Sequence, residues 1–308
     1  MKKKTKFILT AAGITAVSAA TYYGISELAF TSLFSKKNNI VRDGKESDKP
    51  NEDNKDQYDW LNNSIIYDVF IKSLDGLRLH GVKIVNNHSS NLWVILCHGY
   101  GHDHHSILDQ AKHFDDQGYN ILMIDQRSFG LSEGRYTTMA WNEHLDLLQW
   151  IDELSNEYPE AKIVLYGVSM GATSVMLACG TPISSNVVCA IEDCGYNNLK
   201  DMVKLIIKRR LKIPGKPFIL GIKGLIRQRL HYNLKEVDCN RALNNCYVPM
   251  MFIHGEDDKF VPFENVFDNY YACNCDKELY TVENAVHATS YQNPEYYPRV
   301  FKFINRYI

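Results

Sequence analysis

A lone serine stands between two glycines in the run Tyr166–Ala172, which reads YGVSMGA. The run follows apolar residues, at the point where a buried strand should give way to a helix. Such a turn strains the residue at the bend, and side chains two positions to either side would collide. Gly167 and Gly171 remove those side chains, so the pattern predicts a nucleophilic Ser169 hydroxyl. The alternative is a serine that only caps the following helix.

A serine hydroxyl is a weak nucleophile and needs an adjacent base that a third group orients. The candidate base is His287, which follows the last strand-like run of the chain. The candidate acid is Asp258, which follows another apolar run in the stretch His254–Pro262, HGEDDKFVP. Asp193 ends the preceding apolar run and is the alternative acid. These residue types together predict acyl transfer through a covalent intermediate.

The elements that must position these residues are apolar runs of strand length separated by helix-like patterns. The runs are too continuous for strands that bury one face, so they predict parallel strands buried on both faces. They are residues 93–97, 121–124, 163–166, 187–191, 250–253 and 278–282, with helical patterns at 107–117, 139–157, 173–179, 263–272 and 295–307. Residues 68–73 and 79–85, around Asp75-Gly76, predict an antiparallel hairpin at the sheet edge.

Polar residues follow four of these strands at the carboxyl ends, where open α/β sheets bind their ligands. The four stretches are His98-Gly-Tyr-Gly101, Asp125-Gln-Arg-Ser-Phe-Gly-Leu-Ser132, Gly167-Val-Ser-Met-Gly171 and His254–Pro262. In this order and spacing they resemble the α/β-hydrolases, over about residues 65 to 308. The similarity is to the serine-aminopeptidase-like and monoacylglycerol-lipase-like branches, and to bacterial membrane-tethered hydrolases in particular.

The resemblance implies the α/β-hydrolase fold, a mostly parallel eight-stranded sheet with helices on both faces and a helical cap after the sixth strand. It implies the triad order Ser169, Asp258, His287 and an oxyanion hole made by the backbone N–H groups of Tyr100 and Met170. It implies no cofactor and no metal. The loop at residues 125–132 matches a structural loop of the family. One departure is the residue before the histidine, commonly Gly and here Val286.

The first 59 residues differ in composition from the rest of the 308-residue chain. Four lysines precede an uncharged run at residues 7–26, which is long enough to cross a hydrocarbon core of about 30 Å. Residues 1–34 therefore predict a membrane anchor with an extracytoplasmic catalytic domain, or a cleaved signal sequence with secretion. Residues 35–59 contain thirteen charged residues and predict a disordered stalk before a catalytic domain at 60–308.

The predicted cap, at about residues 195–240, is basic and amphipathic. Ten Lys or Arg residues and one acid occur between Lys200 and Arg229, interleaved with aliphatic residues, and Pro214–Pro217 divides the segment into two helices. One interpretation is docking on an anionic membrane surface. The other is a cap that covers the active site while its charges are merely solvated.

Histidines and cysteines suggest other chemistry. The loop at residues 98–105 holds four histidines and an aspartate, a density that could bind a metal ion. Eight cysteines are many for an exported domain, and no C-x-x-C spacing occurs. Cys97 and Cys189 lie in apolar strands, whereas Cys239, Cys246 and the pair at 273 and 275 are candidates for exposure.

We therefore predict a serine hydrolase that cleaves a small-molecule or lipid carboxylic ester. The runner-up is an exopeptidase on the same fold, and a metal-binding or non-catalytic binding module is a further alternative. With a net charge of −2 the chain is not basic enough to suggest a nucleic-acid binder. An exopeptidase would need a carboxylate for the free amine of its substrate, and the basic cap is a poor place to find one.

Overall fold

The computed structural model describes residues 20–36, 50–210 and 215–308 of the chain. Its centre is one eight-stranded sheet in the order β1-β2-β4-β3-β5-β6-β7-β8. The strands are β1 Ile66–Lys72, β2 Arg78–Ile84, β3 Leu92–Cys97, β4 Asn120–Ile124, β5 Lys162–Val168, β6 Val187–Asp193, β7 Met250–Gly255 and β8 Lys277–Val282. Strands β3 to β8 run parallel, whereas β2 pairs antiparallel with both β1 and β4.

The predicted mostly parallel sheet and its edge hairpin are confirmed. The central strands are buried on both faces, as their continuous apolar sequences require. The turn between β1 and β2 includes Gly76 at φ +90°, a conformation that a side chain disfavours. The parallel strands end at one edge of the sheet, and this shared edge brings their polar loops together.

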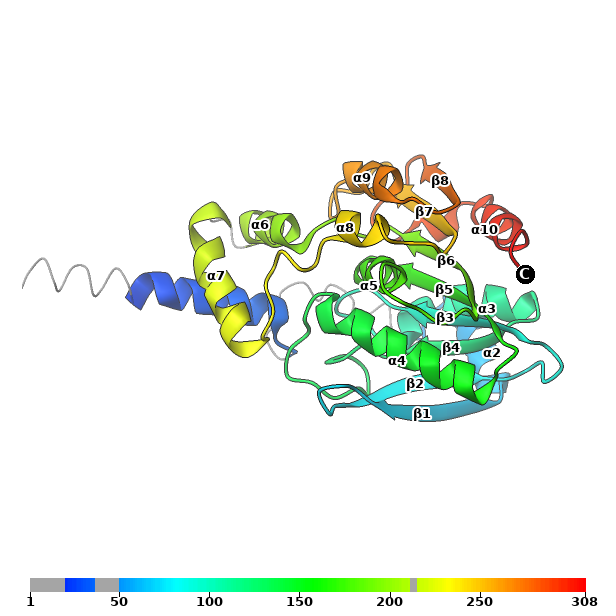
Figure 1. The fold of residues 1–308 in the computed structure, drawn as a ribbon. Helices are drawn as coiled ribbons and strands as arrows, with labels where there is room; N and C mark the ends of the chain where they lie inside the picture. The colour runs from blue at the N-terminus through cyan, green and yellow to red at the C-terminus, as the bar shows by residue number, and fades with distance from the viewer. Residues whose placement is uncertain (1–19, 37–49, 211–214) are drawn as a thin grey trace, which may run out of the picture.

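Helices cover both faces of the sheet (Figure 1). One face packs on α2 Lys55–Asn63, α3 Leu108–Asp116 and α10 Tyr296–Ile304. The other packs on α4 Trp141–Glu157, α5 Met170–Cys179, α8 Cys239–Leu243 and α9 Glu264–Ala272. The helices predicted between the strands are therefore present, and α2 and α8 are additional.

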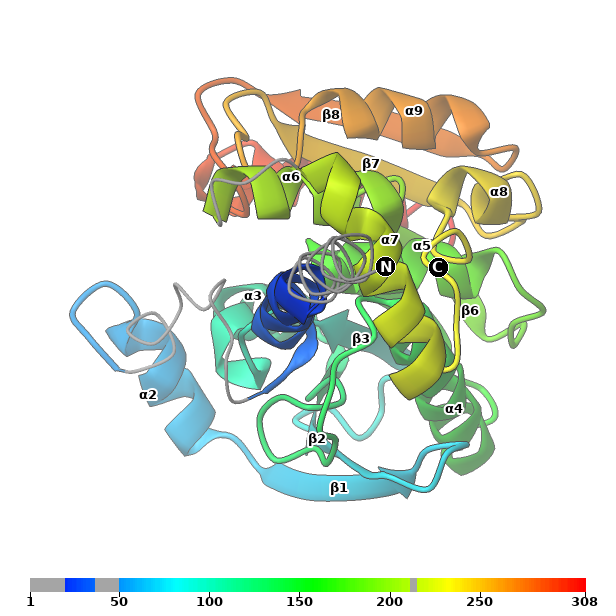
Figure 2. The ribbon, with the colours of Figure 1, turned by 90° about the vertical axis from the view of Figure 1, so that its left-hand side faces the viewer.

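Two further helices, α6 Leu199–Arg210 and α7 Gly215–Arg229, lie between β6 and β7 in the predicted cap region. A third helix, formed by residues 20–34, lies beside α7 in both views (Figures 1 and 2). The backbone N–H of Gly221 in α7 donates to the Tyr22 hydroxyl at 3.0 Å. Arg229 forms a bidentate ion pair with Glu27, with N···O distances of 2.6 and 2.8 Å.

The helix of residues 20–34 is part of the hydrophobic core. The side chains that it buries completely or almost completely are Ser26, Ala29, Phe30, Ser32, Leu33 and Phe34. Its end is also tied to the α/β domain, because Thr137 N–H donates to the Phe34 carbonyl at 2.9 Å. The folded domain therefore includes residues that we assigned to the anchor.

The predicted stalk also differs from the structure at its C-terminal end. Helix α2 begins at Lys55, and Gln57 in it donates to Asp109 of α3 at 2.7 Å. Residues 1–19 and 37–49 lie outside the described residues, and with them most of the predicted anchor and stalk. Within the described ranges, no helix combines the length and apolar character that crossing a membrane requires.

Candidate active site

Ser169 occupies the sharp turn between β5 and α5. Its φ of 56° and ψ of −115° are strained for a residue with a side chain. A Cβ on Gly167 would lie 2.5 Å from the carbonyl carbon of Gly171, and a Cβ on Gly171 would lie 2.7 Å from the carbonyl carbon of Cys97. Both distances are far inside van der Waals contact. The glycines on either side of Ser169 are therefore required by the turn itself.

Ser169, His287 and Asp258 come from three loops at the same edge of the sheet and form one hydrogen-bonded chain. The Ser169 Oγ lies 2.9 Å from His287 Nε2, and His287 Nδ1 lies 2.6 Å from Asp258 Oδ2. Since the ionised carboxylate can only accept, Nδ1 carries a proton in this arrangement. Nε2 of the neutral imidazole is then free to accept the serine proton.

Asp258 is held as an anion in a buried position. Its Oδ1 accepts from the backbone N–H groups of Phe260 and Val261 at 2.8 and 3.0 Å. His254 Nε2 lies 3.1 Å from Oδ2. Burial favours the neutral acid, but the hydrogen bonds from His254 and His287 outweigh it and lower the pKa of Asp258 to about 2.

Asp193, the alternative acid, has different partners. Its Oδ2 accepts from the Tyr296 hydroxyl at 2.8 Å, and burial raises the pKa of its carboxyl. Its backbone carbonyl accepts from the Ser169 N–H at 2.8 Å, so the residue supports the turn through its main chain. Asp257 is exposed, as expected for the neighbour of Asp258.

The loop after β3 approaches Ser169 from the other side. A Cβ on Gly99 would lie 3.5 Å from the Ser169 Cβ, which puts the backbone of this loop beside the nucleophile. His98 turns into the core, where its Nδ1 bonds the Gly99 carbonyl and its Nε2 accepts from Gln126 N–H at 3.0 Å. His98 therefore braces the loop. The Tyr100 hydroxyl donates to the carbonyl of Leu33.

Two other histidines of this loop, His104 and His105, contact carboxylates. His104 Nδ1 lies 2.9 Å from Asp125 Oδ1, and His80 Nδ1 lies 2.7 Å from Asp125 Oδ2. His105 Nδ1 lies 2.9 Å from Asp103 Oδ1. Asp125 thereby joins the loop after β3 to the loop after β4. Groups that could together hold a metal ion do occur here, namely His80, His104 and Asp125, and Asp103, His104 and His105.

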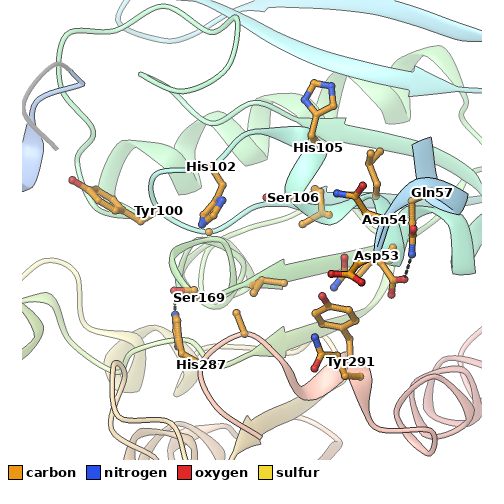
Figure 3. A pocket seen from close by; sticks show the side chains of 18 of the residues that line it. Asp53, Asn54, Gln57, Tyr100, His102, His105, Ser106, Ser169, His287 and Tyr291 are labelled. Atoms are coloured by element: carbon orange, nitrogen blue, oxygen red, sulfur yellow. Dashed lines mark hydrogen bonds between the residues drawn. The ribbon is translucent and has the colours of Figure 1, made fainter. Parts of the chain in front are cut away.

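Two spaces of very different size meet at Ser169. A groove of about 850 Å³ opens on one side and contains His102, Ser106, Asp109, His287 and Tyr291 in its walls. Figure 3 shows Asp53, Asn54 and Gln57 across this groove from Tyr100. On the other side is a cavity of only about 10 Å³, lined by Tyr100, Met139, Ser169, Met170, Tyr196, Met202, Ile206 and Phe260.

The polar wall at Asp53, Asn54 and Gln57 was not predicted from the sequence. The high charge of residues 35–59 indicated disorder, and no sequence motif indicates that this segment lines a site. The side chains that fix α2 to the domain are Gln57, bound to Asp109, and Trp60, whose indole N–H donates to Asp115 at 2.8 Å. The one sequence signal for this packing was an aromatic residue, Trp60, at the end of the charged run.

The sheet order and the strained serine turn are those of the α/β-hydrolase fold. Residues 88–212 match the model of the family described as serine aminopeptidase, S33. Among curated proteins, the chain is 27% identical over 222 residues to the uncharacterized protein YqkD of Bacillus subtilis (strain 168), covering 72% of each chain.

Solved structures with the same fold include esterases and a peptidase. The Pyrococcus furiosus esterase Pf2001 is 26% identical, with a TM-score of 0.66, 84% of this chain and 96% of that chain covered. An acetyl xylan esterase from Paenibacillus sp. R4 has a TM-score of 0.63 at 19% identity, covering 79% and 84%. The Pyrococcus horikoshii acylaminoacyl peptidase has a TM-score of 0.62 at 17% identity, covering 84% and 44%. The chain therefore has an esterase-type hydrolase fold.

Proposed function

We propose that the protein is a serine hydrolase that cleaves carboxylic esters through an acyl-enzyme. The observation that carries the proposal is the hydrogen-bonded chain from Ser169 through His287 to Asp258. Ser169 Oγ attacks the ester carbonyl as His287 Nε2 takes its proton. His287 then gives that proton to the leaving alcohol, and a water molecule repeats the sequence to release the acid.

The developing oxyanion requires donors on the side of Ser169 away from His287. The backbone N–H groups of Tyr100 and Met170 fit this role, because both residues line the small cavity at the nucleophile. Removing one such donor typically costs about 2.7 to 4 kcal/mol of transition-state stabilisation. These donors bind the carbonyl oxygen, and we propose that the acyl chain enters the same cavity because its lining is mainly apolar.

The substrate follows from the difference between the two spaces. The leaving oxygen must lie beside His287, which lines the groove and not the cavity, so the alcohol portion occupies the groove. The acyl group then points into the apolar cavity beneath α6, where Met202 and Ile206 leave little room. We infer a preference for short acyl groups, because a long chain requires α6 to move.

The test is hydrolysis of a series of nitrophenyl esters from acetyl to palmitoyl by the full-length chain. We expect the highest kcat/KM between acetyl and butyryl, and a loss of activity by at least about 10³-fold in Ser169→Ala. Ser155→Ala, on α4 and remote from the groove, is the matched control and should keep full activity. A maximum at long acyl groups would refute the substrate preference, and equal activity in Ser169→Ala would refute the mechanism.

A second candidate, an exopeptidase, is favoured by one observation that the sequence did not suggest. Asp53 lines the groove and presents a carboxylate where the free amine of a peptide could bind. If the enzyme is an exopeptidase, it should hydrolyse aminoacyl anilides, and Asp53→Asn should raise KM several-fold. Asp56→Asn is the control, since Asp56 is exposed on α2 and does not line the groove. Absence of anilide turnover would dismiss this candidate.

A further inference from the structure

Four cysteines from separate parts of the sequence converge at the edge of the sheet opposite the proposed active site. The Sγ atoms of Cys246, Cys273 and Cys275 all lie within 4.8 Å of one another. The Cys273 and Cys275 sulfurs are 2.9 Å apart, and the side chain of Cys179, the last residue of α5, is next to that of Cys246. We call these four residues the thiol cluster.

The thiol cluster joins three segments that pack tightly against each other. Cys179 ends α5, Cys246 lies between α8 and β7, and the other two lie between α9 and β8. A Cβ on Gly180 would lie 2.5 Å from the carbonyl oxygen of Ala242, so the end of α5 touches α8 directly. The Asn274 amide donates to the Asn244 carbonyl at 2.8 Å, which ties the second and third segments.

The position of the thiol cluster separates it from ester hydrolysis. Ser169 precedes the first residue of α5, and Cys179 is the last residue of this ten-residue helix, so about 15 Å of helix lies between them. The cluster therefore cannot contact a substrate at Ser169. Its role must be sought in the stability of the fold.

Tetrahedral zinc is the ligand that this geometry fits. With Zn–S bonds of about 2.3 Å, the sulfurs of a four-thiolate site lie about 3.8 Å apart. The sulfurs of Cys246, Cys273 and Cys275 are within 4.8 Å of one another, and Cys179 must move closer to complete the set. Cys179, Cys246 and Cys273 are almost completely buried, whereas Cys275 is partly exposed and gives an ion access from solvent. Lys277, whose Nζ donates to the Cys273 carbonyl at 2.6 Å, adds a positive charge beside the thiolates.

We propose that the thiol cluster is a structural zinc site in which Cys246, Cys273 and Cys275 bind the ion and Cys179 supplies the fourth thiolate. Binding releases the thiol protons and involves no change of oxidation state. The ion ties α5 to the segments that lead into β7 and β8. These two strands precede the loops that carry Asp258 and His287, so zinc stabilises the frame of the proposed active site without contacting substrate.

The test is the metal content of the full-length protein, purified without chelator from zinc-supplemented medium. We expect about one equivalent of zinc by elemental mass spectrometry, and a lower melting temperature after removal by a chelator. In Cys246→Ala the zinc content after dialysis should fall below about one tenth of the wild-type value. Cys189→Ala, which changes a buried cysteine of β6 outside the cluster, should keep its zinc.

A second measurement uses the wild-type protein and tests the zinc site even if Cys246→Ala does not fold. Cobalt(II) added to the stripped wild-type chain should give the sulfur-to-metal charge-transfer and visible bands of a tetrahedral thiolate site. Absence of zinc, with no cobalt spectrum, would overturn the proposal. A disulfide among the four cysteines in the native protein, detected as a mass two hydrogens below that of the reduced chain, would also overturn it. Neither result depends on hydrolase activity.

Discussion

Shortening Leu33 to alanine tests whether residues 20–34 belong to the catalytic domain. The Leu33 side chain is 1% exposed, and it lies in the main hydrophobic core with Phe30 and Phe34. Buried Leu→Ala changes cost about 2 to 5 kcal/mol, the sum of lost transfer free energy and the cavity left behind. For a domain of this size, each kcal/mol lowers the melting temperature by roughly 2 to 4 °C. We therefore expect a decrease of about 5 to 15 °C.

The matched control is Leu28→Ala in the same helix. Leu28 is 59% exposed, and alanine is an equally good helix former, so its melting temperature should change by no more than about 2 °C. Both variants are compared with the wild type by thermal unfolding of the full-length chain in the same mild detergent. If Leu33→Ala and Leu28→Ala melt alike, the helix does not pack on the domain and the assignment is refuted.

Three other outcomes follow from the structure. Gly171→Ala places a Cβ 2.7 Å from a backbone carbonyl carbon of β3 and should prevent stable folding. Gly224→Ala on α7 has open space around it and should stabilise the protein by up to about 1 kcal/mol. The two variants are compared by soluble yield and thermal unfolding. Because its folded pKa of about 2 is below the ordinary 3.8, ionised Asp258 stabilises the fold by about 2 kcal/mol above pH 4, and this is lost as the pH falls toward 2. The melting temperature should therefore fall less steeply between about pH 5 and 2 in Asp258→Asn, and equal slopes would contradict the assignment. We also propose that the exposed side chains of Lys208 and Arg209 on α6 contact anionic lipid; reversing both to Glu should weaken sedimentation with anionic vesicles, and unchanged binding would dismiss the contact.

The central sheet could be predicted because each parallel strand is a continuous apolar run followed by a distinctive loop. The turn at Ser169 constrains both flanking glycines by backbone contact alone, so the local sequence reveals it. The Asp258 and His287 loops follow strands at the same sheet edge, and the strand order then brings them together.

The parts that were not predicted depend on contacts between distant segments. The average charge of residues 35–59 indicated a stalk, but two specific side chains, Gln57 and Trp60, bind α2 to α3 and its C-terminal end. The thiol cluster is assembled by α5, α8 and α9 from cysteines that share no spacing motif. Neither the composition of a segment nor the spacing of its residues predicts contacts between segments that are distant in the sequence.

The role of Ser169 as the nucleophile is tested most directly by covalent labelling. The full-length chain is treated with a fluorophosphonate, digested and analysed by mass spectrometry. We predict one adduct on Ser169, absent from Ser169→Ala and formed far more slowly in His287→Ala, because Nε2 is the base that activates the hydroxyl. An unlabelled wild-type protein, or an adduct on a different serine that persists in Ser169→Ala, would contradict the proposed mechanism.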